Sequence, residues 1–168
     1  IYGVTKLAGE HMSREFSMET DVPTLICRVF NAYGPNETNP HLIPENHYQE
    51  NADQRTLALG NLEPTRDFIH TTDKARAVRL LVDRHDAGIQ ILNLGRGIEY
   101  SVREIVDAFA RQVGESLDVE QDPQRMRKSD RMHLLADIAR LKAYASWEPR
   151  IGIDEGIATL IEPRAHTQ

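Results

Sequence analysis

The sequence predicts an α/β fold, and two observations carry that prediction. Residues 24–30 and 89–94 are short, nearly continuous apolar runs, which are typical of strands buried in a parallel sheet. Segments with a helical spacing of apolar residues lie before, between and after these runs, and strands that alternate with helices indicate an α/β architecture. The chain has 168 residues, enough for one domain. Two convincing buried strands are nevertheless too few for a self-sufficient doubly wound sheet.

The N-terminal part predicts a helix, a strand and a loop in that order. Apolar residues recur at a helical period over residues 1–19, and Asp21-Val22-Pro23 breaks the pattern. These apolar residues are Val4, Leu7, Ala8, Met12 and Phe16. The run 24–30 predicts the strand, and residues 31–40 predict a loop because Asn, Gly and Pro are frequent there.

The middle of the chain predicts short extended segments and a second helix. Residues 57–60 read as a strand followed by a turn, and residues 66–70 as a further extended segment. Thr71-Thr72-Asp73 supplies capping residues for a helix, which Gly88 ends before the strand 89–94.

The C-terminal part predicts three helices around a polar loop. Ser101 and Glu104 have the spacing of a capping box at the start of the first of these helices. A short strand at 117–120 and a basic loop at 122–131 follow. Two helical segments near 137–145 and 153–162 are separated by Trp147-Glu148-Pro149.

The composition limits the kinds of molecule that this chain is expected to bind. The net charge is −6, which argues against a general nucleic-acid binder because such proteins need a basic face. A few local arginines can still hold a small phosphate-bearing ligand. The sequence contains no apolar run of about 18 residues, so it predicts no membrane span. The single cysteine, Cys27, lies in an apolar run, so we expect a buried thiol and a cytoplasmic protein. No metal site is predicted.

Tyr2 and Lys6 form the first motif that can carry chemistry. Residues four apart on a helix share one face, and an ammonium beside a phenol favours the phenolate. Such a tyrosine can exchange a proton with a hydroxyl near neutral pH. Taken alone, the pair is more often a surface contact.

Three further motifs carry polar groups that can bind a ligand. Asn31 follows an apolar strand, at the edge where open α/β sheets bind ligands, although most such residues only close a turn. Arg66 can bind a diphosphate with its forked guanidinium, and the alternative is a surface pair with Asp67 plus a helix cap at Thr72 or Asp73. The cations of residues 125–131 can hold a phosphate or form a solvated loop.

In this order, the motifs resemble the extended short-chain dehydrogenases/reductases that remodel nucleotide-linked sugars. The resemblance runs from Tyr2 to about Ile161. Its motifs are Tyr2-x-x-x-Lys6, Arg28-Val29-Phe30-Asn31-Ala32-Tyr33-Gly34-Pro35, Arg66-Asp67-Phe68-Ile69-His70, Asn93-Leu94-Gly95, Ala136-Asp137 and Trp147-Glu148-Pro149.

The resemblance implies a fold and a division of the chain. The fold is the C-terminal part of a Rossmann-like doubly wound parallel sheet plus a small α/β substrate-binding domain. Residues 1–35 and 71–100 would belong to the dinucleotide-binding domain. Residues 36–70 and 101–168 would form the domain that binds the sugar nucleotide.

The resemblance also implies an NAD-dependent epimerase or dehydratase that acts on a nucleotide-diphospho-sugar through a 4-keto intermediate. Tyr2 and Lys6 would be catalytic and would both bind the cofactor, with Tyr2 as the acid/base and Lys6 holding the nicotinamide ribose. The implied substrate-binding residues are Asn31, His41, Arg66, Arg127 and Asp130. A homodimer or other homo-oligomer is implied as well.

Two departures from the family pattern concern the cofactor site and the catalytic residues. The Gly-x-Gly-x-x-Gly dinucleotide turn and the upstream Ser/Thr of the catalytic triad are both absent. We therefore expect a chain that begins within its parent protein and is inactive alone. The alternative is a non-catalytic nucleotide-sugar-binding or dimerisation module.

Overall fold

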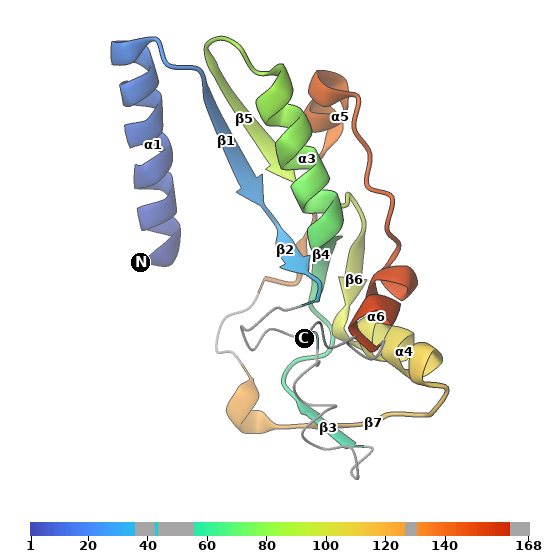
Figure 1. The fold of residues 1–168 in the computed structure, drawn as a ribbon. Helices are drawn as coiled ribbons and strands as arrows, with labels where there is room; N and C mark the ends of the chain where they lie inside the picture. The colour runs from blue at the N-terminus through green and yellow to red at the C-terminus, as the bar shows by residue number, and fades with distance from the viewer. Residues whose placement is uncertain (36–42, 44–55, 127–130, 162–168) are drawn as a thin grey trace, which may run out of the picture.

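The two apolar runs form the first sheet, as the sequence predicts. In the computed structural model, which describes residues 1–35, 43, 56–126 and 131–161, β1 (Thr24–Val29) and β5 (Ile89–Leu94) pair in parallel. Their register runs from Thr24 opposite Ile89 to Val29 opposite Leu94. The helix α1 (Tyr2–Thr20) precedes β1, and α3 (Thr71–Arg84) precedes β5, so strands and helices alternate (Figure 1).

Helix α5 (Ala139–Ala145) packs on β5, and α3 packs on α5 and on the strands that follow β1. The helices and strands meet in a core of fully buried side chains around Trp147. That core contains Ile69, Ala77, Leu81, Leu92, Leu94, Leu141, Ala145 and Trp147. The late residues 139–147 therefore pack with β5 and α3, although the implied division assigns them to the sugar-nucleotide domain. That division remains a prediction.

The second sheet begins where the chain continues beyond β1. After Phe30, the chain continues as β2 (Asn31–Tyr33), which pairs in parallel with β4 (Thr65–His70). The short strands β6 (Glu99–Ser101) and β8 (His133–Leu134) also pair with β4. The prediction of a loop directly after residue 30 was therefore wrong for 31–33, because the partner strand β4 extends the backbone there.

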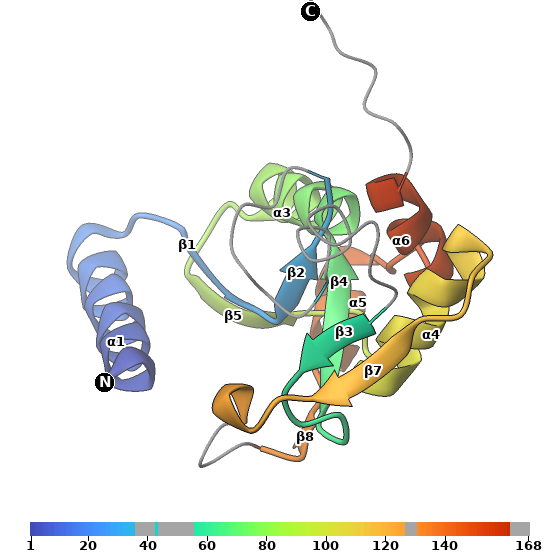
Figure 2. The same cartoon turned by 90° about the horizontal axis from the view of Figure 1, so that it is seen from below.

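The remaining elements build the lower half of the molecule. A third, two-stranded sheet joins β3 (Thr56–Leu59) to β7 (Asp118–Gln121), and a single 3₁₀ turn spans Pro123–Arg125. Two helices, α4 (Val102–Val113) and α6 (Ile153–Ile161), pack on each other, with α6 also on β4 and α4 on β6. Figures 1 and 2 show α1 and the α4–α6 pair on opposite sides of the molecule, with the sheets between them.

The first residues of α4 and α3 test the two helix caps that the sequence predicts. Ser101 and Glu104 form the predicted capping box, with both reciprocal hydrogen bonds present. The predicted cap of α3 at Thr72 or Asp73 was wrong. The ring of His70 caps this helix instead, because its Nδ1 accepts the backbone N–H of Thr72 at 3.3 Å, and Asp73 is buried.

The α1–β1 region is less buried than its apolar sequence predicts. Arg28 and Val29 at the end of β1 are exposed, so this strand is not buried on both faces in the structure. Helix α1 buries only Ser17. Its exposed large apolar side chains are Tyr2, Val4, Leu7, Met12, Phe16 and Met18.

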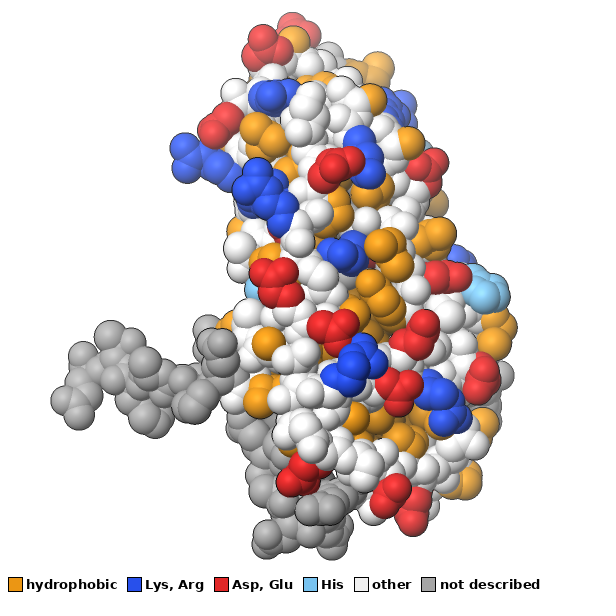
Figure 3. Space-filling model, turned by 90° about the vertical axis from the view of Figure 1, so that its right-hand side faces the viewer, with side chains coloured by type: hydrophobic (Ala, Val, Ile, Leu, Met, Phe, Trp, Pro, Cys, Tyr) orange, Lys and Arg blue, Asp and Glu red, His pale blue; other side chains and the backbone are white. Residues whose placement is uncertain are grey.

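The surface carries charges of both signs. Figure 3 shows acidic and basic side chains interspersed among small apolar areas on the face that carries the C-terminal helices. Within the described ranges, no helix is both long and apolar enough to cross a membrane.

Candidate active site

Tyr2 and Lys6 occupy the first two turns of α1. The Lys6 Nζ atom lies 5.2 Å from the centroid of the Tyr2 ring, so the two side chains share one face of the helix. Both are exposed, and Tyr2 is 76% exposed. Figure 1 shows the start of α1 level with the point where β1 passes into β2, at the carboxyl end of the first sheet. A phenol and an ammonium are therefore both accessible to a ligand at this end of the first sheet.

Asn31 and Arg66 lie on neighbouring strands. Asn31 is the exposed first residue of β2 and pairs with Phe68 of β4, two residues beyond Arg66. The Arg66 Nη1 atom donates to the carbonyl oxygens of Thr65 and Arg131, each at 2.7 Å. The guanidinium is thus anchored by backbone next to the basic loop. The predicted contacts His41, Arg127 and Asp130 lie outside the described residues.

Asp67 is a buried hub and not the surface partner of Arg66 that the sequence offered as an alternative. Its carboxylate accepts the backbone N–H groups of Arg96 at 2.6 Å, Gly97 at 2.7 Å and Ala136 at 3.3 Å. Burial raises the pKa of Asp67, although these three donors oppose the shift. A side chain at Gly95 would lie 2.8 Å from the Asp67 Oδ2 atom, so glycine is needed there. Asp67 therefore joins β4 to the turn after β5 and to the segment before α5.

Asp73 is a second hub, at the start of α3. Its Oδ2 atom accepts the backbone N–H groups of Arg150 and Ile151, each at 2.8 Å, and its Oδ1 atom accepts from Arg76 at 2.7 Å. Burial raises the pKa of Asp73, but the hydrogen bonds from Arg76 and the backbone outweigh it, and the net shift is downward. The guanidinium of Arg76 also lies over the Trp147 ring, 5.4 Å from its centroid. Asp73 thus holds the segment that leads into α6.

Tyr33 is a core residue, in contrast to Tyr2. It is 2% exposed, its ring packs edge-on against Phe68 and His70, and its hydroxyl donates to the carbonyl of Gly152 at 3.4 Å. Burial raises the pKa of the Tyr33 hydroxyl well above its ordinary value. Such a phenol is a poor proton donor or acceptor near neutral pH.

Sequence reasoning missed the roles of Asp67 and Asp73, since their backbone N–H donors are 29 to 78 residues away along the chain. One signal was available in the sequence. Asp67 directly precedes Phe68 and Ile69 in a segment predicted to be extended, and a charge placed in a buried strand needs several hydrogen-bond partners.

Comparison with known proteins identifies the family of this chain. The family model for GDP-mannose 4,6 dehydratase matches residues 1–160. The chain is 27% identical to the GDP-6-deoxy-D-mannose reductase of Pseudomonas aeruginosa, with 95% of this chain and 54% of that protein covered. It is 29% identical to the dTDP-L-rhamnose 4-epimerase of Burkholderia thailandensis, with 95% and 45% covered.

Solved structures with a similar fold also match this chain. RMD from Pseudomonas aeruginosa complexed with NADPH superimposes with a TM-score of 0.84 at 25% identity, covering 95% of this chain and 54% of that one. MoeE5 in complex with UDP-glucose and NAD gives a TM-score of 0.83 at 30% identity, with 96% and 54% covered. The chain spans about half the length of the relatives it matches. It belongs to the GDP-mannose 4,6-dehydratase family of the extended short-chain dehydrogenases/reductases.

Proposed function

We propose that this chain is the acid/base and substrate-binding part of an NAD-dependent epimerase or dehydratase that acts on a nucleotide-diphospho-sugar through a 4-keto intermediate. The observation that carries the proposal is the Tyr2–Lys6 pair, exposed on one helix face with the ammonium 5.2 Å from the ring centroid. Its family relatives include proteins named for GDP-linked and dTDP-linked sugars, which supports the substrate class.

Tyr2 is proposed to exchange a proton with the sugar 4-hydroxyl. The positive charge of Lys6 stabilises negative charge that develops on the phenol oxygen during this transfer. A nicotinamide, when bound, supplies the acceptor for the hydride that leaves C4. The exposed ammonium of Lys6 suits a ribose hydroxyl of that cofactor, because it offers three N–H donors.

The chain contains no Gly-x-Gly-x-x-Gly turn that could hold the dinucleotide pyrophosphate. We therefore propose that residues outside this chain bind the pyrophosphate, and that the chain has no turnover on its own. Detectable hydride transfer by the purified chain would contradict this part of the proposal.

The substrate diphosphate is proposed to lie beside β2 and β4. Arg66 would bind it, with Asn31 on the neighbouring strand as a second contact. His41, Arg127 and Asp130 remain proposed contacts from the family resemblance. The exposed apolar side chains of α1 support a further proposal, that this helix forms the homodimer interface implied by the family.

Isothermal titration calorimetry of the chain with UDP-, dTDP-, GDP- and CDP-sugars tests the binding part. We expect one nucleotide class to bind, and the Arg66→Gln variant to weaken that binding at least about tenfold, since a charge-assisted contact is lost. The matched control is Arg103→Gln, at an exposed position of α4. Equal affinities of the two variants would contradict the role of Arg66, and no binding by any sugar would contradict the proposed substrate class.

A further inference from the structure

Within this chain, helix α1 has little hydrophobic packing against the sheet. Within the described residues, only Ser17 of this helix is buried, and the hydroxyl of Ser17 donates to Val22 in the link that follows. The large apolar side chains of α1 are exposed. Within this chain, apolar burial therefore contributes little to the distance and rotation of α1 relative to β1.

A bidentate ion pair joins the two elements instead. The Arg28 Nε atom donates to the Glu10 Oε1 atom at 2.8 Å, and the Nη2 atom donates to Oε2 at 2.7 Å. The Glu10 side chain is 18% exposed and that of Arg28 is 51% exposed. The hydrogen bond from Arg28 lowers the pKa of Glu10. A forked contact of this kind fixes orientation as well as distance, because both planar groups must align.

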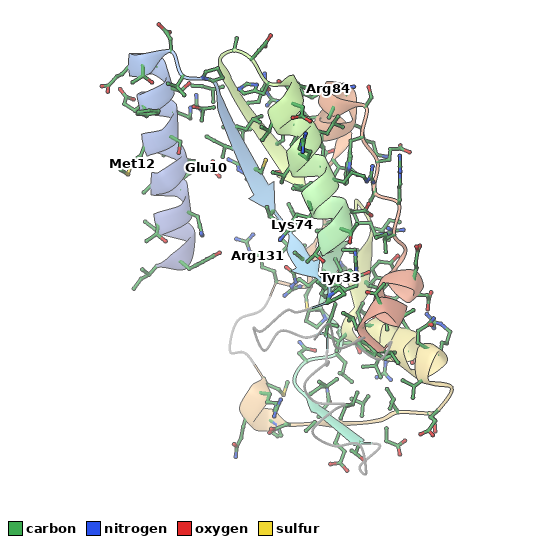
Figure 4. The ribbon with its side chains drawn as sticks, in the orientation of Figure 1. Glu10, Met12, Tyr33, Lys74, Arg84 and Arg131 are labelled. Carbon is green, nitrogen blue, oxygen red and sulfur yellow. The ribbon has the colours of Figure 1, made fainter. Side chains whose placement is uncertain are left out.

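The pair connects the two parts of the candidate site. Glu10 follows Tyr2 and Lys6 at a spacing of four residues, so the three side chains form one row along α1. Figure 4 shows Glu10 pointing from α1 toward β1, whereas Met12 points away from it. Its partner Arg28 lies in β1, three residues before Asn31.

Strand β1, which carries Arg28, is held by its pairing with β5. Arg28 pairs with Asn93 of β5, and the backbone N–H of Phe30 donates to Leu94 at 3.0 Å. Because Arg28 lies on this paired strand, its ion pair with Glu10 fixes α1 relative to the sheet. Other ion pairs, such as Arg111 with Asp154, join elements remote from α1.

We propose that Glu10 and Arg28 are positioning residues, whose ion pair sets where Tyr2 and Lys6 stand relative to Asn31. This inference rests on the proposed function. Loss of the pair would let α1 rotate or shift on β1, and a displacement of about 1 Å can cost on the order of a hundredfold in rate.

Two experiments test the proposal. In the first, spin labels at Gly3→Cys and Val82→Cys, in a Cys27→Ser background, report the distance between α1 and α3. A side chain at Gly3 meets nothing within 4 Å, and Val82 is exposed. We expect Glu10→Gln to broaden or shift the distance distribution, and the control Asp154→Asn to leave it unchanged. An unchanged distribution in Glu10→Gln would overturn the proposal.

The second experiment uses an active polypeptide that contains this chain. We expect Glu10→Gln to lower kcat by about 10- to 100-fold with little change in KM for the nucleotide sugar, because the substrate contacts remain. The same substitution in a Tyr2→Phe background should add almost no further loss, since Glu10 acts through Tyr2.

Additive losses from Glu10→Gln and Tyr2→Phe would overturn the positioning role. Restored kcat in the charge-swapped double variant Glu10→Arg, Arg28→Glu would support it. Absence of turnover from every polypeptide that contains the chain would overturn the proposed function, and with it the positioning role. The spin-label distances would still report in that case whether the ion pair fixes α1.

Discussion

Replacing Asp67 with asparagine tests how strongly one buried carboxylate holds three segments together. The carboxylate accepts one backbone N–H on Oδ1, from Arg96, and two on Oδ2, from Gly97 and Ala136. An asparagine presents only one oxygen. Its best orientation keeps the two contacts of Gly97 and Ala136 and turns the NH₂ group toward the N–H of Arg96.

The expected cost follows from that one lost contact. A hydrogen bond to a charged group contributes about 1.5–3 kcal/mol, and the part-buried Arg96 N–H would face the amide NH₂ group in place of an acceptor. The neutral amide offsets part of this loss, because burial disfavours the Asp67 carboxylate and raises its pKa. We expect a net destabilisation of about 2 kcal/mol, which for a chain of this size corresponds to a fall in Tm of about 4–8 °C.

Urea and thermal unfolding followed by circular dichroism measure this difference. The matched control is Asp86→Asn, at an exposed position in the turn before β5, which should change stability by less than about 0.5 kcal/mol. If Asp67→Asn is as stable as that control, the three backbone contacts do not hold the junction and the reasoning is wrong.

Two other changes are predicted from buried contacts. Burial lowers the pKa of His70, despite the opposing charges of Asp73 and Glu155. The unfolded chain therefore binds more protons, so this contribution to stability is complete above about pH 6.5 and lost as the pH falls. Urea midpoints from pH 8 to 5 should fall more steeply for the wild type than for His70→Gln, and parallel curves would refute this. Gly156→Ala should destabilise by about 1–3 kcal/mol in thermal unfolding, because its Cβ would lie 2.7 Å from the Tyr33 Cζ atom. Gly9→Ala, with nothing within 4 Å, should stabilise by up to about 1 kcal/mol, and equal effects of the two substitutions would contradict the packing.

Local patterns predicted the elements whose causes are local. The capping box of Ser101 and Glu104 depends on residues three apart, and the structure contains it. The apolar runs that became β1 and β5 were also recognised, because strands inside parallel sheets have continuous apolar sequences. The α/β fold and the family could therefore be inferred before any coordinates.

Contacts between distant segments could not be inferred in the same way. The short strands β2, β6 and β8 exist because β4 offers them a partner, and their own sequences carry no strand pattern. The ring of His70 caps α3 because His70 ends β4 directly before this helix. The predicted caps Thr72 and Asp73 were therefore wrong. The ion pair of Glu10 with Arg28 likewise depends on how α1 lies beside β1.

The central claim is that Tyr2 moves a proton at the sugar 4-hydroxyl. Its most direct test is kcat for nucleotide-sugar turnover by an active polypeptide that contains this chain, compared between Tyr2→Phe and the control Tyr144→Phe. Tyr144 lies in α5, where its hydroxyl contacts His85 at 2.8 Å. We predict that Tyr2→Phe lowers kcat by about 10²- to 10⁴-fold, the usual contribution of a positioned acid/base, while Tyr144→Phe stays within about twofold of wild type. Unchanged turnover in Tyr2→Phe would contradict the claim.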